Sequence, residues 1–355
     1  MVKPQETWRG HDKLNDTLKE IAMKAMLLRE QKSVEERPLI YTDIPDPEPG
    51  PGQIRLKVLA CGLCHTDLHE VEGDLAVPGL PRVIGHEIVG LVDKQGEGAK
   101  RFKLGDRVGV PWLYRTCGKC KFCLSGRENL CDKAQFTGFD VNGGYAELMV
   151  VDEDFAYAMP DHFSHANAAP LLCAGVIGFR ALRLSEIKPG QRLGLYGFGA
   201  SAHVAIQVAV HWGCEVYVFS RSEEHRRLAR KLGASWTGTS KDKPPAKVDS
   251  AVHFAPSGPL TLDALMALEK GGTLALASIY MSTVPEMDYQ RHLYNERTLR
   301  SVTAATRQDA IDILKLADEI PIRTEVQEFA LQDANEALLQ MKQSRIQGAA
   351  VMLIS

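Results

Sequence analysis

The chain has 355 residues, and at about 150 residues per domain this length predicts two domains. Hydrophobic residues make up 45% and charged residues 25%, as in ordinary globular proteins, which excludes collagen-like, low-complexity and largely disordered chains. The net charge of −3 provides no basic excess for a nucleic-acid partner. No apolar run approaches the ~20 residues that would predict a membrane span.

Residues 1–22 are interpreted as an N-terminal extension, because a new start follows at Met23. Leu14, Leu18 and Ile21 recur at helical spacing and mark a weakly amphipathic face, which favours a surface arm over a docking segment. The extension lacks the apolar core of a secretory signal. Because cysteines without an export signal favour reduced metal ligands over disulfides, we predict a cytoplasmic protein.

Residues 23–175 are predicted to form a β-rich domain. Short apolar runs interrupted by Gly and Pro recur from about residue 24 to 160, as is typical of strands joined by turns. The clearest runs are residues 53–59, 88–92 and 107–110. The Pro-rich stretch over 44–52 predicts a turn-dense surface connection.

Two thiols and one imidazole in this region could form a metal site. Cys64, His86 and Cys173 supply the two thiolates and one imidazole of a catalytic zinc site with an open position. The residues alone do not decide whether these three side chains form one metal site. Cys61 and Cys64 also fit a C-x-x-C redox pair, and Cys173 also fits a small buried core residue.

Four further cysteines lie close together, with the spacing C-x2-C-x2-C-x7-C. Four thiolates in a closed tetrahedron form a structural zinc site, which holds a loop together and leaves no position for chemistry. An iron–sulfur cluster is the alternative. The bacterial ferredoxin pattern, however, has three residues before its last Cys and a Pro directly after it, and neither feature occurs here. The predicted ligands are Cys117, Cys120, Cys123 and Cys131.

The pattern changes near residue 175. Strand-like runs at 192–196, 215–219, 249–254 and 273–279 alternate with helical patterns at 200–212, 222–232 and 260–269. This alternation predicts a doubly wound α/β domain over 176–305. A helical stretch over 308–320 and a β-like tail over 350–354 predict that residues 306–355 rejoin the β-rich domain.

A dinucleotide-binding turn is predicted between the first strand and helix of the α/β domain. Gly197, Gly199 and Ala202 match G-x-G-x-x-G/A, which allows a tight turn, close approach of a pyrophosphate and close helix packing. At the end of the second strand, Ser220 and Arg221 replace the acidic residue that would bind the ribose of NAD. A hydroxyl and a guanidinium favour the 2′-phosphate of NADP(H).

Together these motifs resemble the zinc-containing alcohol dehydrogenases of the medium-chain dehydrogenase/reductase superfamily. The resemblance covers residues 23–355 and implies a GroES-like β-rich catalytic domain, a Rossmann domain, two zinc ions per chain and NAD(P)(H). It rests on motifs in the family's order: Gly62-x-Cys64-His65-Thr66-Asp67-x-His69, Gly85-His86-Glu87, the four-cysteine loop, Cys173-Ala174-Gly175 and the dinucleotide turn.

The resemblance implies that Cys64, His86 and Cys173 are the ligands of the catalytic zinc. Asp67 matches a carboxylate that orients the ligand histidine. Glu87 matches a carboxylate close to the metal that assists ligand exchange.

Within the same motifs, Thr66 and His69 match a proton relay from the bound alcohol to solvent, and His65 matches a contact with the coenzyme pyrophosphate. Cys61 and Cys214 match no role, and we expect both to be buried structural thiols.

Three positions depart from the family's pattern. Ile177 stands where relatives often have a Thr near the nicotinamide, and Ala349 where many have an Arg, so that Arg345 becomes an alternative pyrophosphate contact. Trp112 matches an aromatic residue of the substrate pocket, but Leu75 replaces a second Trp. This replacement predicts a wider pocket for primary alcohols or aldehydes longer than ethanol, including aromatic ones.

Two other functions remain as alternatives. One is an NADPH-dependent aldehyde reductase of the cinnamyl type, and the other is a zinc-binding interaction module without catalysis. The strand-like run over 299–303 predicts an exposed sheet edge, which favours a homodimer or homotetramer.

Overall fold

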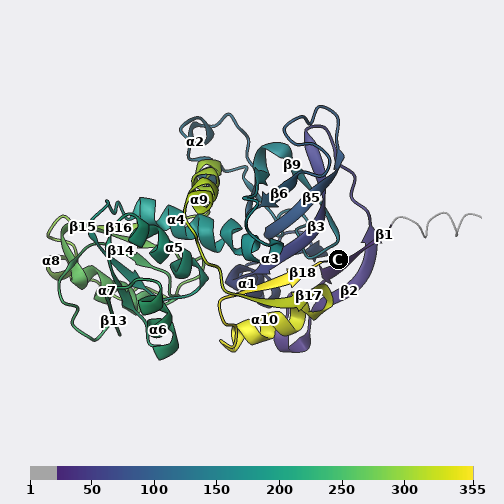
Figure 1. Ribbon diagram of the computed structural model, residues 1–355. Helices are drawn as coiled ribbons and strands as arrows, with labels where there is room; N and C mark the ends of the chain where they lie inside the picture. Colours follow the sequence, from purple (N-terminus) through teal and green to yellow (C-terminus); the bar gives the residue numbers. More distant parts are fainter. Residues whose placement is uncertain (1–21, 355) are drawn as a thin grey trace, which may run out of the picture.

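The computed structural model describes residues 22–354 and places two sheet-based halves side by side (Figure 1). One half is the predicted β-rich part, and the other is a parallel sheet covered by helices. The helical spacing expected for Leu14, Leu18 and Ile21 lies outside the described residues.

The β-rich half contains two larger sheets and one small one. Its seven-stranded sheet has the order β10-β6-β5-β3-β18-β17, with β9 also paired to β3, and its three-stranded sheet has the order β2-β1-β4. The strands are β1 (Ala22–Leu28), β2 (Leu39–Pro45), β3 (Gln53–Leu63), β4 (Arg82–Val83), β5 (Glu87–Gln95), β6 (Arg107–Val110), β9 (Leu148–Asp152) and β10 (Tyr157–Ala158). A two-stranded sheet joins β7 (Leu113–Arg115) to β8 (Gln135–Phe136).

The last strands of the chain return to this half. β17 (Val326–Ala330) pairs in parallel with β18 (Ala349–Leu353), and β18 pairs antiparallel with β3. Figure 1 shows these yellow strands beside the purple strands of the N-terminal part. The seven-stranded sheet therefore combines strands from the N-terminal part of the chain with the last two strands.

The other half is a six-stranded parallel sheet with the order β13-β12-β11-β14-β15-β16. In chain order this is 3-2-1-4-5-6, the arrangement of doubly wound dinucleotide-binding folds. The strands are β11 (Arg192–Tyr196), β12 (Glu215–Phe219), β13 (Trp236–Gly238), β14 (Val248–His253), β15 (Leu268–Leu276) and β16 (Thr298–Ser301).

Side chains along each strand of this sheet alternate between two helical layers, because successive strand residues point to opposite faces. Leu193 and Leu195 of β11 belong to the core that includes the helices α4 and α5, whereas Tyr196 belongs to the core that includes α7. The longer helices are α1 (His65–Glu72), α4 (Ala174–Leu184), α5 (Ala200–His211), α6 (Glu223–Lys231), α7 (Gly258–Ala267), α9 (Arg307–Glu319) and α10 (Ala334–Lys342). The short ones are α2 (Lys121–Leu124), α3 (His165–Ala168) and α8 (Tyr289–His292).

The predicted elements of the α/β half occur where the sequence pattern placed them. β11 and β12 have the predicted bounds, and α5, α6 and α7 lie within two residues of theirs. The run over 273–279 differs, because β15 ends at Leu276 and the following residues line the cleft described below. Between residues 22 and 354, no helix has the length and apolar character needed to cross a membrane.

Candidate active site

A cleft of about 2110 Å³ is lined by residues from both halves of the molecule. It includes the carboxyl ends of β11 and β14, where the strand order reverses and such sheets bind ligands. Many of the predicted site residues line it: Cys64, His65, Thr66, His69, Leu75, His86, Glu87, Trp112, Cys173, Ile177, Gly197, Gly199, Ser220 and Arg221.

The three predicted catalytic ligands meet on one wall of this cleft. One ligand atom from each of Cys64, His86, Glu87 and Cys173 lies within 4.8 Å of the others. The Cys64 sulfur is 3.3 Å from Nε2 of His86 and 3.9 Å from the Cys173 sulfur. The Glu87 carboxylate therefore belongs to the same group as the three predicted ligands.

Local backbone geometry explains this meeting of distant residues. Cys64 is the N-cap of α1, where its backbone N–H donates to Asp67 Oδ2 at 2.7 Å in a capping box. Gly62 on β3 gives room to the Glu87 side chain, since a Cβ at Gly62 would lie 2.0 Å from a Glu87 oxygen. Cys173 lies between a 3-10 helix and α4, at the N-cap position of α4.

Asp67 lies behind His86, as predicted. Its Oδ1 is 3.4 Å from Nδ1 of His86, both side chains are buried, and these two atoms have no other hydrogen-bond partner among the described residues. This pairing fixes the ring with Nε2 toward the sulfurs. The imidazole is thus oriented as a ligand.

The electrostatics of the group fit a divalent cation. Burial lowers the pKa of His86, but the Asp67 carboxylate and the Cys64 thiol outweigh it and raise the pKa well above the usual value. The neighbouring Cys173 and burial raise the pKa of Cys64, and burial raises the pKa of Glu87 to about 8. Two sulfurs and an oriented imidazole are the donor set of a catalytic zinc site.

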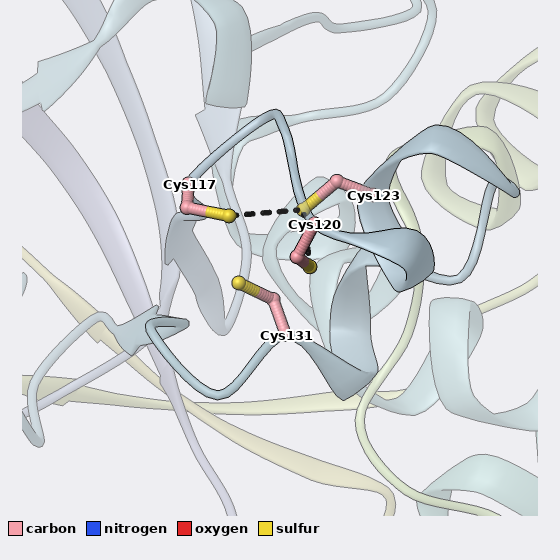
Figure 2. A group of neighbouring side chains, drawn as sticks. All are labelled: Cys117, Cys120, Cys123 and Cys131. Atoms are coloured by element: carbon pink, nitrogen blue, oxygen red, sulfur yellow. Dashed lines mark hydrogen bonds between the residues drawn. The ribbon is translucent and has the colours of Figure 1, made fainter.

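The other four cysteines converge at one point in the β-rich half (Figure 2). Cys117 and Cys120 lie 3.9 Å and 3.6 Å from the Cys123 sulfur, and Cys131 completes the group after a 3-10 turn. We call residues 117–131 the four-cysteine lobe.

Backbone N–H groups of the lobe point at its sulfurs. The amides of Lys119 and Cys120 lower the pKa of Cys117 to about 6, and the N–H of Lys133 donates to the Cys131 sulfur at 3.4 Å. Donors of this kind stabilise thiolates, the form in which cysteine binds metal. The group therefore fits a closed structural zinc site.

The predicted dinucleotide turn lies between β11 and α5. Gly197 has φ +86°, and a Cβ there would lie 2.9 Å from the backbone N of Ala255, so only glycine fits. Gly199 is the N-cap of α5 and faces open space, whereas Ala202, in the first turn of α5, is fully buried. The turn thus leaves the helix N-terminus open to an anion.

Ser220 and Arg221 follow the end of β12. Ser220 is buried, and its Oγ accepts from the N–H of Ser222 at 3.3 Å. Ser222 caps α6 by accepting from the N–H of His225, so the N-terminus of this helix also faces the cleft. The exposed Arg221 side chain has no ion-pair partner within residues 22–354 and remains available to a ligand.

The predicted relay residues lie on the cleft side of α1, which places Thr66 and His69 one turn apart. His69 Nδ1 is 2.8 Å from Asp74 Oδ2, a partner that sequence analysis missed. Gly73 ends α1 in a left-handed conformation and turns the chain back toward His69. In the sequence, the glycine directly before Asp74 was the signal that could have indicated this turn and the contact with His69. His65 lies on the exposed wall of the cleft.

An aromatic wall stands next to the metal ligands. The ring of Trp112 lies 4.8 Å from that of His86, edge to face, and stacks on Phe136 at 5.1 Å. The ring of Phe139 lies 5.9 Å from that of Trp112, tilted by 46°. Sequence analysis found Trp112 but missed Phe136, which lies in the two-residue strand β8, and Phe139, which lies in a turn, because neither segment gives a periodic pattern.

The remaining predicted positions have simple surroundings. Ile177 lies in the first turn of α4 and lines the cleft. Ala349 and the exposed Arg345, which come later in the chain, line the cleft as well. Cys61 and Cys214 are buried, as expected. All eight cysteines are free, and Cys61 donates to the carbonyl of Gly62, so it forms no C-x-x-C disulfide with Cys64.

Comparison with protein families gives two matches, one in each half of the chain. Residues 50–161 match the alcohol dehydrogenase GroES-like domain, and residues 202–319 match the zinc-binding dehydrogenase domain. The first range holds the four-cysteine lobe and the ligands Cys64 and His86, and the second begins within the dinucleotide turn.

Individual relatives extend over nearly the whole chain. A probable alcohol dehydrogenase AdhA from Mycobacterium tuberculosis (strain CDC 1551 / Oshkosh) is 45% identical over 94% of this chain and 97% of its own. A cinnamyl alcohol dehydrogenase from Sorghum bicolor is 27% identical with a TM-score of 0.84, covering 93% and 97%. CAD from Helicobacter pylori, complexed with NADP(H), is 25% identical with a TM-score of 0.83, covering 94% and 98%.

Proposed function

This chain belongs to the zinc-containing alcohol dehydrogenases of the medium-chain dehydrogenase/reductase superfamily, and on that basis we propose that it interconverts primary alcohols and aldehydes with a preference for NADP(H). The observation that carries the proposal is the meeting of two features in one cleft. The Cys64–His86–Cys173 group and the dinucleotide turn at Gly197 line the same cavity. A reduced dinucleotide and a metal-held substrate can therefore meet there.

The residues on the cleft wall have distinct roles in this proposal. A zinc ion held by Cys64, His86 and Cys173 would supply Lewis-acid polarisation of the substrate oxygen. The dinucleotide would supply the hydride acceptor or donor. Asp67 keeps the His86 ring oriented, and the Glu87 carboxylate stands beside the ligands for exchange of the fourth one.

The proton follows α1 toward solvent. Thr66 is buried at the cleft wall, and His69 lies one turn further along the helix. His69 can pass a proton outward because its Nδ1 contacts the exposed carboxylate of Asp74. We assign Thr66 and His69 as the relay and His65 as a contact of the coenzyme pyrophosphate.

The preference for NADP(H) rests on the end of β12. Ser220 takes the place of the acidic residue that would pair with a ribose hydroxyl, and Ser220, Arg221 and the N-terminus of α6 line the cleft. All three suit a phosphate monoester. The test is kcat/KM for NADPH and NADH with one alcohol, where equal values or a higher value for NADH would contradict the proposal.

The substrate pocket favours alcohols larger than ethanol. Trp112, stacked on Phe136 and packed against the tilted ring of Phe139, forms an apolar wall, while Leu75 occupies less space than an aromatic residue. We expect kcat/KM to rise from ethanol to hexanol and benzyl alcohol, and Leu75→Trp to reverse this order. A steady decline along the series in the wild type would exclude the wide pocket.

Metal analysis tests the two sites separately. Purified protein is expected to hold two zinc ions per chain, and Cys64→Ser is expected to lose one of them together with turnover. Cys120→Ser is expected to lose the other. A wild-type chain with one zinc ion would contradict the catalytic assignment while leaving the family membership unaffected.

A second candidate is an aldehyde reductase of the cinnamyl type, favoured by the similarity to the sorghum enzyme and by Arg221. This reductase would carry out the same hydride transfer as the proposed alcohol dehydrogenase, but mainly from aldehyde to alcohol. A kcat/KM for cinnamaldehyde with NADPH at least about 100-fold above that for the alcohol with NADP would favour the reductase.

Two further properties belong to the proposal. β16 is the edge strand of the parallel sheet, and an edge of this kind pairs readily with a second copy, so we expect a homodimer or homotetramer by light scattering. Because both metal groups need reduced thiols, we place the protein in the cytoplasm.

A further inference from the structure

The segment between β16 and α9, residues 302–307, is held from two sides. It forms part of the cleft wall, from Val302 to Thr306. Ala304 within it has φ +46°, a left-handed conformation that is unfavourable for a residue other than glycine. Such a backbone persists only where the surrounding contacts enforce it.

The first set of contacts comes from the four-cysteine lobe. The Asn129 side-chain amide donates to the carbonyl of Thr303 at 2.7 Å. Glu128 Oε1 accepts from the backbone N–H of Arg307 at 3.0 Å and lies 3.4 Å from its guanidinium Nε. Glu128 and Asn129 are 5% and 4% exposed, so two buried side chains of the lobe make these bonds.

The position of these two residues links them to the metal group. They lie in the 3-10 turn at Glu128–Leu130, directly before Cys131, and the turn ends on the Cys131 backbone. In Figure 1 the lobe, marked by α2, lies next to the end of α9. A metal held by the four sulfurs would therefore fix the turn that carries both side chains.

The second set of contacts comes from α4, the helix that follows Cys173. Asp309 is fully buried and accepts from Arg180 at 2.6 Å and from Arg183 at 2.5 Å. The same carboxylate accepts from the N–H and hydroxyl of Thr306, closing a capping box at the start of α9. Asp309 thus links Thr306 to α4, whereas among residues 22–354 the side-chain hydrogen bond to Thr303 comes from the lobe alone.

We propose that Glu128 and Asn129 are positioning residues for the dinucleotide, through which the four-cysteine lobe holds residues 303–307 in the shape that the cofactor requires. The lobe then serves binding of the cofactor rather than only the stability of its own loop. The inference rests on the proposed function in one respect, namely that a dinucleotide occupies the cleft. It is independent of the substrate and of the preference between NADP and NAD.

The test measures dinucleotide affinity in the zinc-loaded, full-length protein without substrate, by fluorescence titration with NADPH. We expect Glu128→Ala/Asn129→Ala to raise Kd by about tenfold or more while both zinc ions stay bound. In turnover, KM for the dinucleotide rises in the same proportion, and kcat at saturation stays within twofold. Loss of fold alone would not give this division between KM and kcat.

A double-mutant comparison links the effect to the lobe. Cys120→Ser, which removes the lobe's metal, is expected to raise Kd to a similar extent, and combining it with Glu128→Ala/Asn129→Ala is expected to add little. Asp132→Ala is the matched control. Asp132 directly follows Cys131, and its carboxylate is exposed, so its removal should leave Kd within twofold.

Several results would overturn the inference. One is a double variant with both zinc ions and a wild-type Kd, and another is full additivity between the lobe variant and the double variant. If the alanine variants do not fold, Asn129→Asp decides, because it keeps the size of the side chain but replaces the amide donor to Thr303 with a carboxylate that cannot donate, and a wild-type Kd there contradicts the proposal. Failure of the wild type itself to bind NADPH or NADH would contradict the proposed function instead.

Discussion

Arg221 stands directly after Ser220 at the end of β12, and its exposed guanidinium faces the cleft. A charge-assisted bond to a phosphate contributes about 1.5–3 kcal/mol, and 1.4 kcal/mol corresponds to a factor of ten in affinity. We therefore expect Arg221→Ala to raise KM for NADPH by about tenfold or more and to leave KM for NADH within twofold.

Arg230→Ala provides the matched control for this measurement. Arg230 also lies on the surface of α6, but it pairs with Glu223 and Thr237 and is absent from the cleft wall. Its removal should change neither KM. Equal losses for NADPH and NADH in Arg221→Ala would show that the guanidinium contacts a part common to both cofactors.

Asp74 gives a second prediction for a single side chain. Its carboxylate accepts from His69, and a bond to an ionised acceptor is stronger than one to a neutral amide by about 1 kcal/mol. Asp74→Asn should therefore lower kcat for alcohol oxidation by about fivefold if proton release limits turnover. Added imidazole should restore part of the loss, because an external base replaces the weakened relay.

The exposed Asp161, which lies outside the cleft, is the control, and Asp161→Asn should leave kcat unchanged. If imidazole accelerates wild type and Asp74→Asn by the same factor, Asp74 takes no part in proton transfer.

Among the secondary-structure elements, those with local patterns were predictable and those with distant partners were not. β11 and β12 follow directly from apolar runs that end in a Gly-rich turn and in Ser220. The pairing of β18 with β3 joins segments about 290 residues apart, and no local pattern specifies it. The four structural ligands were predictable from the spacing of their cysteines and the three catalytic ligands from the family's motifs, whereas Asp74 and the Glu128–Arg307 contact depend on how loops pack.

β14 ends in a buried histidine that makes stability depend on pH. His253 is fully buried, its Nδ1 lies 3.4 Å from the Thr261 hydroxyl, and its Nε2 has no partner among the described residues. Burial lowers its pKa to about 4. Between the unfolded pKa of about 6.5 and this folded value, the unfolded chain binds a proton that the folded chain does not, so stability falls as pH falls.

From pH 6.5 to 5 this loss amounts to about 2 kcal/mol, or roughly 3 °C in Tm for a chain of this length. We expect His253→Gln, which cannot titrate, to show a smaller drop in Tm between pH 7.5 and 5 than wild type. The exposed His211 is the control, and His211→Gln should keep the wild-type difference. An unchanged difference in His253→Gln would mean that His253 is already charged in the folded protein.

Across the whole molecule, one apolar core joins the two halves. Ala60 and Val89 of the β-rich sheet and Val351 of the C-terminal strand belong to the same buried cluster as Leu195 and Val216 of the parallel sheet. This continuity follows from the return of β18 to β3, which brings the end of the chain back beside the first half. Two halves that share a core cannot unfold one at a time without exposing it.

We therefore expect the zinc-loaded protein to unfold in a single cooperative transition, although its length and topology define two domains. Far-UV circular dichroism, which follows mainly the helices of the α/β half, and the fluorescence of Trp112 in a variant whose other three tryptophans are replaced by Phe should change at the same temperature. Val89→Ala removes two methyl groups from the shared core and should lower stability by about 2–3 kcal/mol. Because Val89 belongs to the core that both halves share, the variant should shift the whole transition without splitting it. Two resolved transitions in the wild type would show that the shared core couples the halves too weakly to unite their unfolding.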